Sequence, residues 1–296
     1  MGSLIPTLLR KNRVGEPLLR KLLLTLLIAS FLLLTVFSLS AQNYLRVTFI
    51  DVGEGDSCLI QTPGGKNIII DGGKTNQGKK ILSFLKKKKI RKIDTMVATH
   101  PDMDHIGGLL AILDSNIEIE NVLDSGHKHT SYAYQDFLLK VAERKDIKYY
   151  QPRAGQIFDW GEGLKVQVLS PAHLFHNAND SSIVIKLTYG LTSFLFTGDA
   201  GYPAEDEMIA NFRKGLKSTI LKAGHHGAKT STSSSFLNYV RPRAAIISVG
   251  PNSYGHPVPK VLNRLKEIGA KVYRTDKRGS ITITTDGKKC WIETER

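Results

Sequence analysis

A ten-residue stretch, THPDMDHIGG at positions 99–108, contains the residues whose types and spacing best suit chemistry. It holds two imidazoles and two carboxylates, at His100, Asp102, Asp104 and His105. Positions i and i+2 of extended backbone point the same way, so His100 and Asp102 can face one place while Asp104 and His105 face a second. Imidazole and carboxylate groups are ligands for zinc and similar metals. The stretch therefore predicts two neighbouring metal sites. The alternative is a helix N-cap aspartate among incidental histidines.

Further potential ligands lie where two other predicted strands end. Asp199 follows the apolar run in FLFTGD, and His225 begins the histidine pair in ILKAGHHG. Asp199 on its own could be a turn aspartate. A His-His-Gly sequence directly after a strand is harder to explain structurally. We therefore expect these residues to converge with the 99–108 stretch.

The elements that must position these residues are strands with helices between them. The apolar run Ile93–Thr99 predicts a buried strand that ends where the ligand-rich stretch begins, and a helix is expected over 105–113. A very basic helix is expected over 78–90 and an amphipathic one near 132–143. There are no repeats and no low-complexity linker. The pattern predicts one domain over residues 44–294, with β-strands inside and helices outside.

The chain is basic as a whole. Its 296 residues include 41 Lys and Arg against 27 Asp and Glu, which gives a net charge of +14. A basic surface suits a polyanionic partner such as nucleic acid or anionic lipid. A solvated surface that only keeps the protein soluble is the alternative, and charge alone leaves both open.

The N-terminal region, residues 1–41, is typical of a membrane or export segment. Leu22–Leu39 carries no charge over 18 residues and follows Arg20 and Lys21. This length is at the short limit for a spanning helix and long for a signal-peptide core. The basic residues place the N-terminus in the cytoplasm. We predict a cleaved signal peptide or a single membrane anchor, with the following domain secreted or held at the extracellular face of the cytoplasmic membrane.

The chain has two cysteines, Cys58 and Cys290. They share no short metal-binding spacing, and each lies in an apolar, strand-like run. Two buried free thiols are expected, and a single disulfide bond is the alternative in an exported protein.

Several motifs in one order resemble the metallo-β-lactamase fold superfamily. They are the run HxDxDH, the upstream Asp71-Gly72-Gly73, and the downstream Thr197-Gly198-Asp199 and His225. More narrowly, the chain is similar to the extracytoplasmic hydrolase domain of ComEC-type DNA-uptake proteins, over pieces that run from residue 49 to residue 257. The resemblance covers only the hydrolase part, and the many-helix channel of those proteins lies outside the matched pieces. The resemblance implies an α+β fold: an αββα four-layer sandwich of two mixed β-sheets flanked by helices.

The resemblance also implies two divalent metal ions and their ligands. The first ion would be bound by His100 and Asp102, the second by Asp104, His105 and His225, with Asp199 bridging both. Zinc is the expected metal. Asp102 stands where most of the superfamily has histidine, which hardens the first site and makes manganese the alternative. The further histidine usual at the first site is missing from HNANDSSIVIKL, where Asn179 and Ser182 lie; His173 and His176 could substitute.

The remaining residue roles are also implied by the resemblance. A metal-bound hydroxide would attack the substrate, and Asp104 would hold or deprotonate that water. Asp71 is expected to orient ligands from the second shell. His226 and His256 could contact a phosphate or donate a proton to the leaving oxygen, or only complete a hydrogen-bonded turn. The residues assigned to substrate binding are Lys229, Asn179 and Ser182.

The function expected from this resemblance is a metal-dependent phosphodiesterase or nuclease that acts on DNA outside the cytoplasm. The first alternative is a hydrolase of another ester class, either a lactone or a cell-wall choline phosphodiester. The second is a non-catalytic module that binds polyanions, against which the retention of Asp199 and His225 argues. The expected partners are DNA or another phosphodiester substrate, and the membrane if the N-terminal segment is uncleaved. No obligate protein partner is evident.

Overall fold

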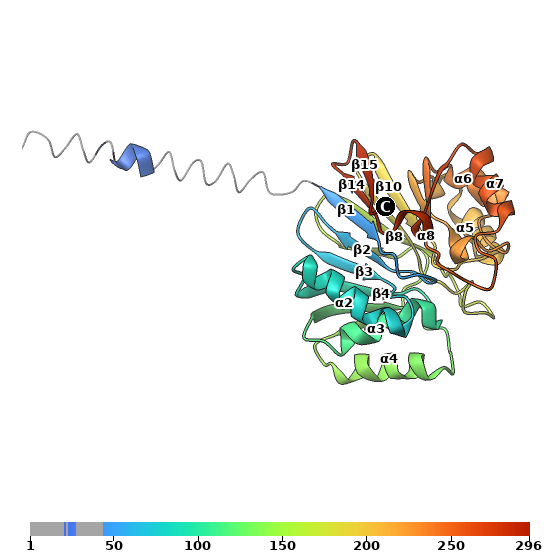
Figure 1. Ribbon diagram of the computed structural model, residues 1–296, viewed down its shortest axis with the longest axis horizontal. Coiled ribbons are helices and arrows are strands. Elements are labelled where there is room, and N and C mark those ends of the chain that lie inside the picture. The colour runs from blue at the N-terminus through green and yellow to red at the C-terminus, as the bar shows by residue number, and fades with distance from the viewer. Residues whose placement is uncertain (1–20, 22, 28–43) are drawn as a thin grey trace, which may run out of the picture. The chain divides into compact units, whose positions relative to one another are not determined.

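The computed structural model describes residue 21, residues 23–27 and residues 44–296 (Figure 1). Most of the predicted N-terminal segment, residues 1–41, lies outside the described residues. Lys21 and residues 23–27 are helical. Within the described ranges, no helix combines the length and hydropathy that a membrane crossing needs. Residues Tyr44–Arg296 form a compact unit of their own.

Two mixed β-sheets form the centre of this unit. In the eight-stranded sheet, β1, β2 and β3 pair antiparallel and β3 to β6 pair parallel. In the seven-stranded sheet, β10 to β13 pair parallel and the remaining strands pair antiparallel. In spatial order the first sheet contains β15 (Cys290–Thr294), β14 (Ile281–Thr285), β1 (Leu45–Phe49), β2 (Cys58–Gln61), β3 (Asn67–Ile70), β4 (Lys92–Ala98), β5 (Glu118–Asp124) and β6 (Lys148–Tyr150). The second contains β13 (Lys271–Arg274), β12 (Ala244–Ile247), β11 (Ile220–Lys222), β10 (Thr192–Phe196), β9 (Val184–Tyr189), β8 (Leu164–Ser170) and β7 (Ile157–Phe158).

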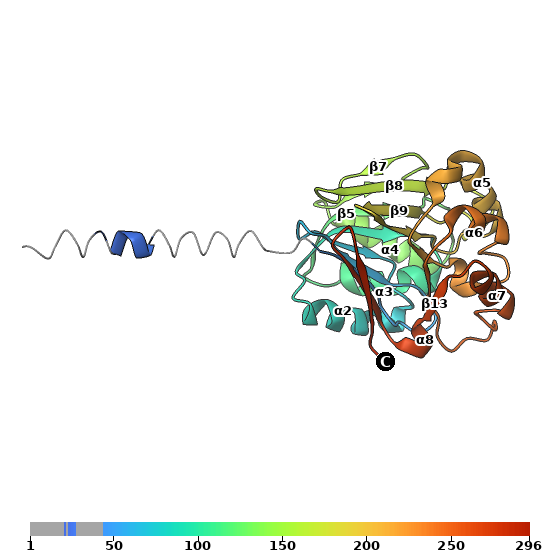
Figure 2. The same cartoon turned by 90° about the horizontal axis from the view of Figure 1, so that it is seen from above.

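Helices cover the outer face of each sheet (Figures 1 and 2). The first sheet is covered by α2 (Gly78–Lys87), α3 (Met103–Leu113) and α4 (Tyr132–Glu143). The second is covered by α5 (Tyr202–Phe212), α6 (Ser234–Val240) and α7 (Pro259–Glu267), while the short α8 (Thr275–Arg278) leads into β14. Three 3₁₀ turns complete the order: η1 (Thr75–Gln77), η2 (Arg213–Leu216) and η3 (Gly224–Gly227). The predicted four-layer αββα sandwich is confirmed.

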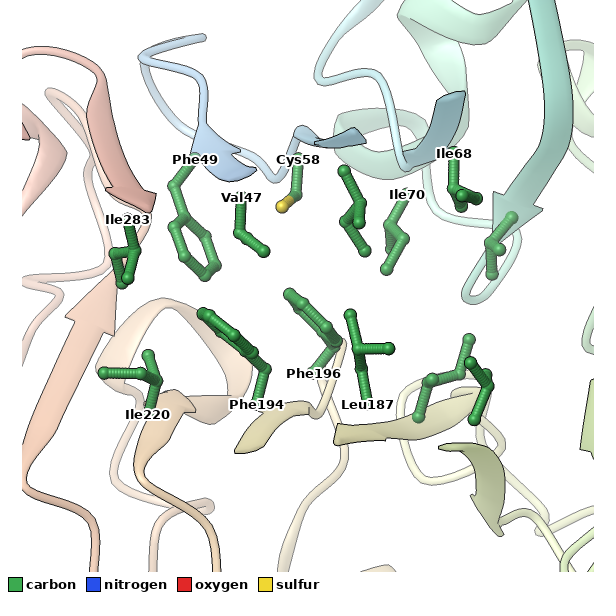
Figure 3. Close-up of a cluster of buried hydrophobic side chains, with 14 of the residues drawn as sticks. Val47, Phe49, Cys58, Ile68, Ile70, Leu187, Phe194, Phe196, Ile220 and Ile283 are labelled. Atoms are coloured by element: carbon green, nitrogen blue, oxygen red, sulfur yellow. The ribbon is translucent and has the colours of Figure 1, made fainter. Parts of the chain in front are cut away.

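Side chains from the facing sheets fill the space between them (Figure 3). Successive strand residues alternate between faces, so Ile68 and Ile70 point into the inter-sheet core whereas Ile69 packs against the helices. Phe194 and Phe196 of β10 enter the same core from the opposite sheet. The strands are apolar on both faces because both are covered, which explains the near-continuous hydrophobic runs in the sequence.

The two cysteines are not bonded to each other. Cys58 is a buried free thiol in the inter-sheet core, as predicted. Cys290 is also free but exposed, so the expectation of a second buried thiol is wrong. Cys290 begins β15, the edge strand of the first sheet, where only one neighbouring strand covers it.

One buried carboxyl group joins the second helical layer to the loop that follows η3. Glu205 of α5 accepts hydrogen bonds from the backbone N–H groups of Thr232 and Ser233, the latter at 2.9 Å. Burial raises the pKa of Glu205 to about 7, although these hydrogen bonds oppose the shift. The folded state therefore holds the proton more tightly than the unfolded chain, whose pKa is about 4.3.

This shift predicts a stability loss between about pH 4.5 and pH 7, where only the unfolded state ionises. Glu205→Gln should remove this pH-dependent loss in the free energy of unfolding, which is on the order of 3 kcal/mol. At low pH the same change should lower the free energy of unfolding by about 1 kcal/mol, because one hydrogen-bond acceptor is lost. Melting temperatures of variant and wild type at pH 5 and pH 8 measure the difference. The exposed neighbour Asp206, changed to Asn, is the control. If the difference in melting temperature between wild type and Glu205→Gln is the same at pH 5 and pH 8, the raised pKa of Glu205 is contradicted.

Candidate metal centre

Three buried histidines each present an unpartnered Nε2 atom. His105 donates from Nδ1 to Asp71 Oδ2 at 2.8 Å, and His226 donates from Nδ1 to the carbonyl oxygen of Ser248 at 2.9 Å. The Nδ1 of His100 lies 3.1 Å from the hydroxyl of the preceding threonine. Among the described residues, none of the three Nε2 atoms has a hydrogen-bond partner. A proton held on Nδ1 leaves the Nε2 lone pair free to bind a metal ion.

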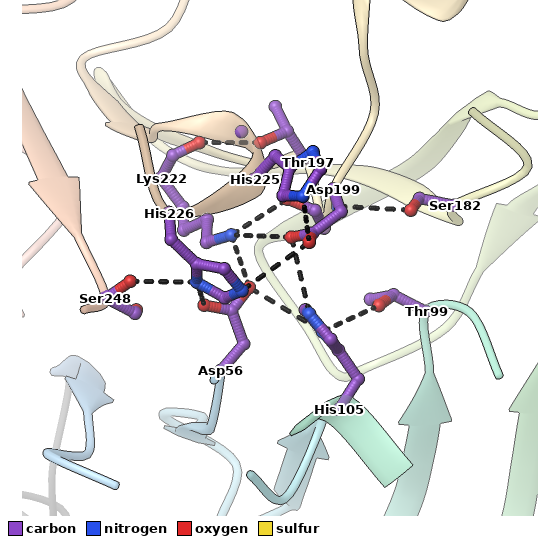
Figure 4. A network of polar contacts seen from close by, with 12 residues as sticks. Asp56, Thr99, His105, Ser182, Thr197, Asp199, Lys222, His225, His226 and Ser248 are labelled. Atoms are coloured by element: carbon purple, nitrogen blue, oxygen red, sulfur yellow. Dashed lines mark hydrogen bonds and ion pairs between the residues drawn. The ribbon is translucent and has the colours of Figure 1, made fainter. Parts of the chain in front are cut away.

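The free Nε2 atoms of His105 and His226 converge on Asp199 at distances that suit a shared ion (Figure 4). His105 Nε2 lies 3.4 Å from Asp199 Oδ1. His226 Nε2 lies 3.4 Å from Asp104 Oδ2 and 3.5 Å from Asp199 Oδ2. These separations are long for N–H···O hydrogen bonds. Two ligands of one tetrahedral zinc ion lie roughly 3.3 Å apart, given bonds of about 2.0–2.1 Å. The donor set therefore fits a divalent metal ion between these four residues.

A second group of donors lies beside the first. His100 Nε2 is 3.5 Å from Asp102 Oδ2, and His100 also groups with His105 and Asp199 within metal-binding reach. Asp102 Oδ1 faces His129 Nε2 at 3.8 Å. Asp199 is thus within reach of both groups. This second group, which corresponds to the metal site expected at His100 and Asp102, offers fewer buried donors, in line with the missing histidine in the sequence.

The structure distinguishes the two members of the His-His pair in η3. His226, rather than His225, joins Asp104 and His105. His225 Nε2 lies 3.7 Å from Asp199 Oδ2, and its side chain is 28% exposed. Both residues have left-handed backbone, with φ of 48° and 52°. Such a conformation is costly outside glycine. By position, His226 is the candidate ligand beside Asp104 and His105, whereas His225, the residue expected from the sequence, faces Asp199 alone among these carboxylates.

Asp71 acts at the position expected for a ligand-orienting carboxylate. Besides His105 Nδ1, it accepts hydrogen bonds from the backbone N–H of Thr99 at 2.9 Å and from its hydroxyl at 2.8 Å. These contacts join the end of β3 to the loop after β4 and to the first turn of α3. They fix the tautomer and the ring orientation of His105.

A buried lysine and a further aspartate, which the sequence did not indicate, also border the centre. The Nζ of Lys222 contacts Asp56 Oδ2, donates to the Gly198 carbonyl oxygen at 2.8 Å, and lies 3.6 Å from Asp199 Oδ1. Asp56 Oδ1 lies 3.5 Å from His226 Nδ1. Asp56 stands in the glycine-flanked run GEGDS, and Lys222 ends the apolar run of β11. An acid between glycines and a lysine at the end of a buried strand are the sequence features that could have identified Asp56 and Lys222.

The surrounding charges shift the pKa values of the acids and of the lysine. Burial alone would raise the pKa of Asp199, but His226, His105 and Lys222 hold it well below its usual range. The same competition, with His226 and His105 outweighing burial, lowers the pKa of Asp104. Burial would lower the pKa of Lys222, but Asp56 and Asp199 raise it. The carboxylates are therefore held ionised, the form that binds metal.

The residues predicted to bind substrate lie in different environments. Ser182 is fully buried; its hydroxyl accepts from the Asp199 N–H at 3.1 Å and lies 3.4 Å from His100 Nδ1, so it positions ligands and cannot contact substrate. Asn179 lines a hollow of about 340 Å³ that also reaches Asp199 and His225. Lys229 is exposed, and its carbonyl oxygen accepts from the Tyr202 hydroxyl.

The other histidines considered for this centre fall into two classes. His173 pairs with Glu207 at 2.8 Å, and neither His173 nor His176 belongs to a potential metal-binding group among the described residues. His256 lies at the rim: its ring contacts that of His225 at a centroid distance of 5.6 Å, and its buried Nδ1 has no hydrogen-bond partner among the described residues. Its position beside the centre leaves it available to a bound substrate.

The exchange of the two histidines gives a direct prediction. His226→Ala should lose the ion shared with Asp104 and His105, whereas His225→Ala should retain it and serves as the matched control. Asp199→Ala should release metal from both groups because both use its carboxylate. Elemental analysis of the desalted proteins gives the metal content. Metal loss in His225→Ala with full retention in His226→Ala would restore the original assignment.

Comparison with known proteins gives the relationships of the chain. The family model for the metallo-beta-lactamase superfamily matches residues 50–250. ComE operon protein 3 of Bacillus subtilis is 33% identical over 270 residues, which cover 85% of this chain and 34% of that protein. Recombination protein 2 of Haemophilus influenzae is 33% identical over 284 residues, which cover 91% of this chain and 33% of that protein. The chain thus spans about a third of the length of these curated relatives.

A solved structure shares the fold. CmlA, a diiron β-hydroxylase from Streptomyces venezuelae, aligns over 80% of this chain and 53% of its own, with a TM-score of 0.53 and 13% sequence identity. At this identity the likeness concerns architecture only. The family match, the two relatives and the four-layer sandwich agree with the motifs in the sequence. The chain belongs to the metallo-beta-lactamase superfamily of hydrolases.

Proposed function

We propose that the Tyr44–Arg296 unit hydrolyses phosphodiester bonds of nucleic acid, with DNA as the substrate, at two divalent metal ions. The observation that carries the proposal is the convergence of three buried, unpartnered Nε2 atoms on Asp199 and its neighbours. Such a donor set suits two-metal hydrolysis. The choice of DNA rests on the likeness to Recombination protein 2 and to Competence protein ComA of Neisseria gonorrhoeae, which is 30% identical over 243 residues, and on the resemblance to DNA-uptake proteins. Zinc is the proposed metal, since imidazole nitrogens dominate the buried donors.

In this proposal some residues of the centre contact the metal ions, water or substrate, and others orient the metal ligands. When bound, divalent ions would lower the pKa of a coordinated water to about 7 and neutralise charge on a phosphoryl group. Asp104, whose side chain is 26% exposed, faces both His226 and solvent and is placed to orient the attacking water. Asp71 and Ser248 fix the imidazole tautomers of His105 and His226. His256 at the rim is placed to contact a phosphate or the leaving oxygen.

Lys222 and Asp56 have a supporting role in this proposal. The ammonium group of Lys222 lies between Asp56 and Asp199 and donates to the carbonyl oxygen of Gly198, which precedes Asp199. It therefore restrains the Asp199 carboxylate at Oδ1, the oxygen that also faces His105 Nε2. A buried ion pair of this kind is costly to break on one side only, because the remaining charge is left without compensation.

The proposed place of action is outside the cytoplasm. Its support is the uncharged run Leu22–Leu39 after two basic residues, together with the competence relatives. The proposal includes either retention at the membrane through that run or secretion after its removal. DNA is the proposed partner, and the membrane is a partner where the run is retained.

A comparison of substrates tests this function. The purified chain, loaded with zinc or manganese, should cut circular single-stranded DNA, and Asp104→Asn should slow cutting by roughly 100-fold or more, since it loses both a ligand and a water-orienting carboxylate. Asp136→Asn, on the exposed face of α4, is the control. Gel analysis of the products reports internal cleavage. Rapid hydrolysis of a lactone or a choline phosphodiester without any DNA cleavage would refute the proposal.

A further inference from the structure

An exposed tyrosine lies at the rim of the metal centre. Tyr254 is 71% exposed, in the loop between β12 and α7. Its ring stacks on that of His256, with a centroid distance of 5.6 Å and an interplanar angle of 25°. His256 in turn contacts His225, also at 5.6 Å. A row of three rings therefore leads from solvent to the side of Asp199.

The loop that carries Tyr254 is fixed before any ligand arrives. The side-chain oxygen of Asn252 accepts from the backbone N–H groups of Tyr254 and His256, at 3.1 and 3.0 Å. Its nitrogen donates to the carbonyl oxygens of Gly250 and His256, both at 2.9 Å. One amide thus spans the whole loop. An aromatic side chain on a fixed loop loses little conformational entropy on binding.

The base of this loop packs directly against the loop that carries Asp56. A Cβ atom on Gly250 would lie 2.4 Å from the backbone of Gly53, so only glycine allows this approach. The Tyr254 loop is consequently held to the metal centre itself. An exposed ring on a loop this firmly held suggests contact with a ligand at the centre, because a surface tyrosine without such a role needs no fixed loop.

Two hollows adjoin the inner rings of the row. One, of about 340 Å³, is lined by His225, Asn179 and Tyr202 and also by Asp180 and Asp199. The other, of about 570 Å³, is lined by His256 and Asn252, by the cations Lys277 and Arg296, and by Asp51 and Asp276. A chain molecule therefore has room beside both His225 and His256. Exposed aromatic rings beside scattered cations are the usual features of sites that bind single-stranded nucleic acid.

We propose that Tyr254 is a stacking platform for a nucleobase next to the scissile phosphate, so that the substrate is a single-stranded polynucleotide. This inference rests on the proposed function. Stacking explains why the ring is exposed, aligned with His256 and fixed by Asn252. A cage for a quaternary ammonium group would instead surround its ligand with several aromatic faces, whereas here two nearly parallel rings present one open face.

The test measures binding of two oligomers to the full-length protein with its metal ions in place, and both oligomers have phosphorothioate links that resist cleavage. One is an oligothymidylate, and the other has the same length and backbone but no bases. Tyr254→Ala should weaken oligothymidylate binding by roughly 5- to 150-fold, the range of base–aromatic stacking. Binding of the abasic oligomer should not change. Tyr254→Trp should restore oligothymidylate binding, and Tyr132→Ala, at an exposed tyrosine on α4, should have no effect.

The possible results are distinguishable. Equal effects of Tyr254→Ala on both oligomers, or no effect on either, would overturn the stacking role even if the enzyme cleaves DNA. Loss of phosphocholine binding in Tyr254→Ala, with oligothymidylate binding intact, would assign the ring to a cationic head group and overturn the inference. Failure of the wild type to bind either oligomer or to cleave any phosphodiester would remove the proposed function and this inference together.

Discussion

The contacts of a single carboxylate hold the centre together. Asp71 follows β3 with a left-handed backbone, φ 57°, and its N–H donates to the carbonyl oxygen of Val97 in β4 at 2.9 Å. Its side chain then binds Thr99 twice and His105 once. It therefore joins two parallel strands and the start of α3 at the point where the ligands begin. Without these contacts, the imidazole of His105 would be free to rotate, and Asp104 and His105 would no longer be oriented toward the centre.

Close backbone packing makes this arrangement possible. A Cβ atom on Gly108 would lie 1.9 Å from the carbonyl oxygen of Gly72. Gly108 N–H in turn donates to the carbonyl oxygen of Gly73 at 2.9 Å. The two glycine pairs in DGG and HIGG are thus the two faces of one contact between α3 and the loop after β3. This contact sets the height of α3 over the sheet, and with it the place of His105.

The fold and half of the centre could be read from the sequence because their signals are local. The stretch at 99–108 places four donors in one loop, and its strand and helix neighbours have clear hydrophobic patterns. The residues that were missed come from elsewhere: Asp56 precedes β2 of one sheet and Lys222 ends β11 of the other, and they meet only because the sheets face each other. The choice between His225 and His226 depends on two left-handed residues in succession, which no periodicity reveals.

The positive net charge of the chain does not reflect the charge around the candidate metal centre. The run Lys86–Lys89 begins in the last turn of α2 and precedes β4, whereas the ligands follow the other end of β4. That strand has seven residues and therefore separates the lysine run from His100 by roughly 20 Å. Around the candidate metal centre, acids outnumber cations. In the proposed function, recognition of a polyanion would therefore rest on bound metal ions, on isolated cations such as Lys277, and on apolar contact with the bases. Because stacking on an aromatic ring is indifferent to base identity, this arrangement favours a substrate defined by its single-stranded form and not by its sequence.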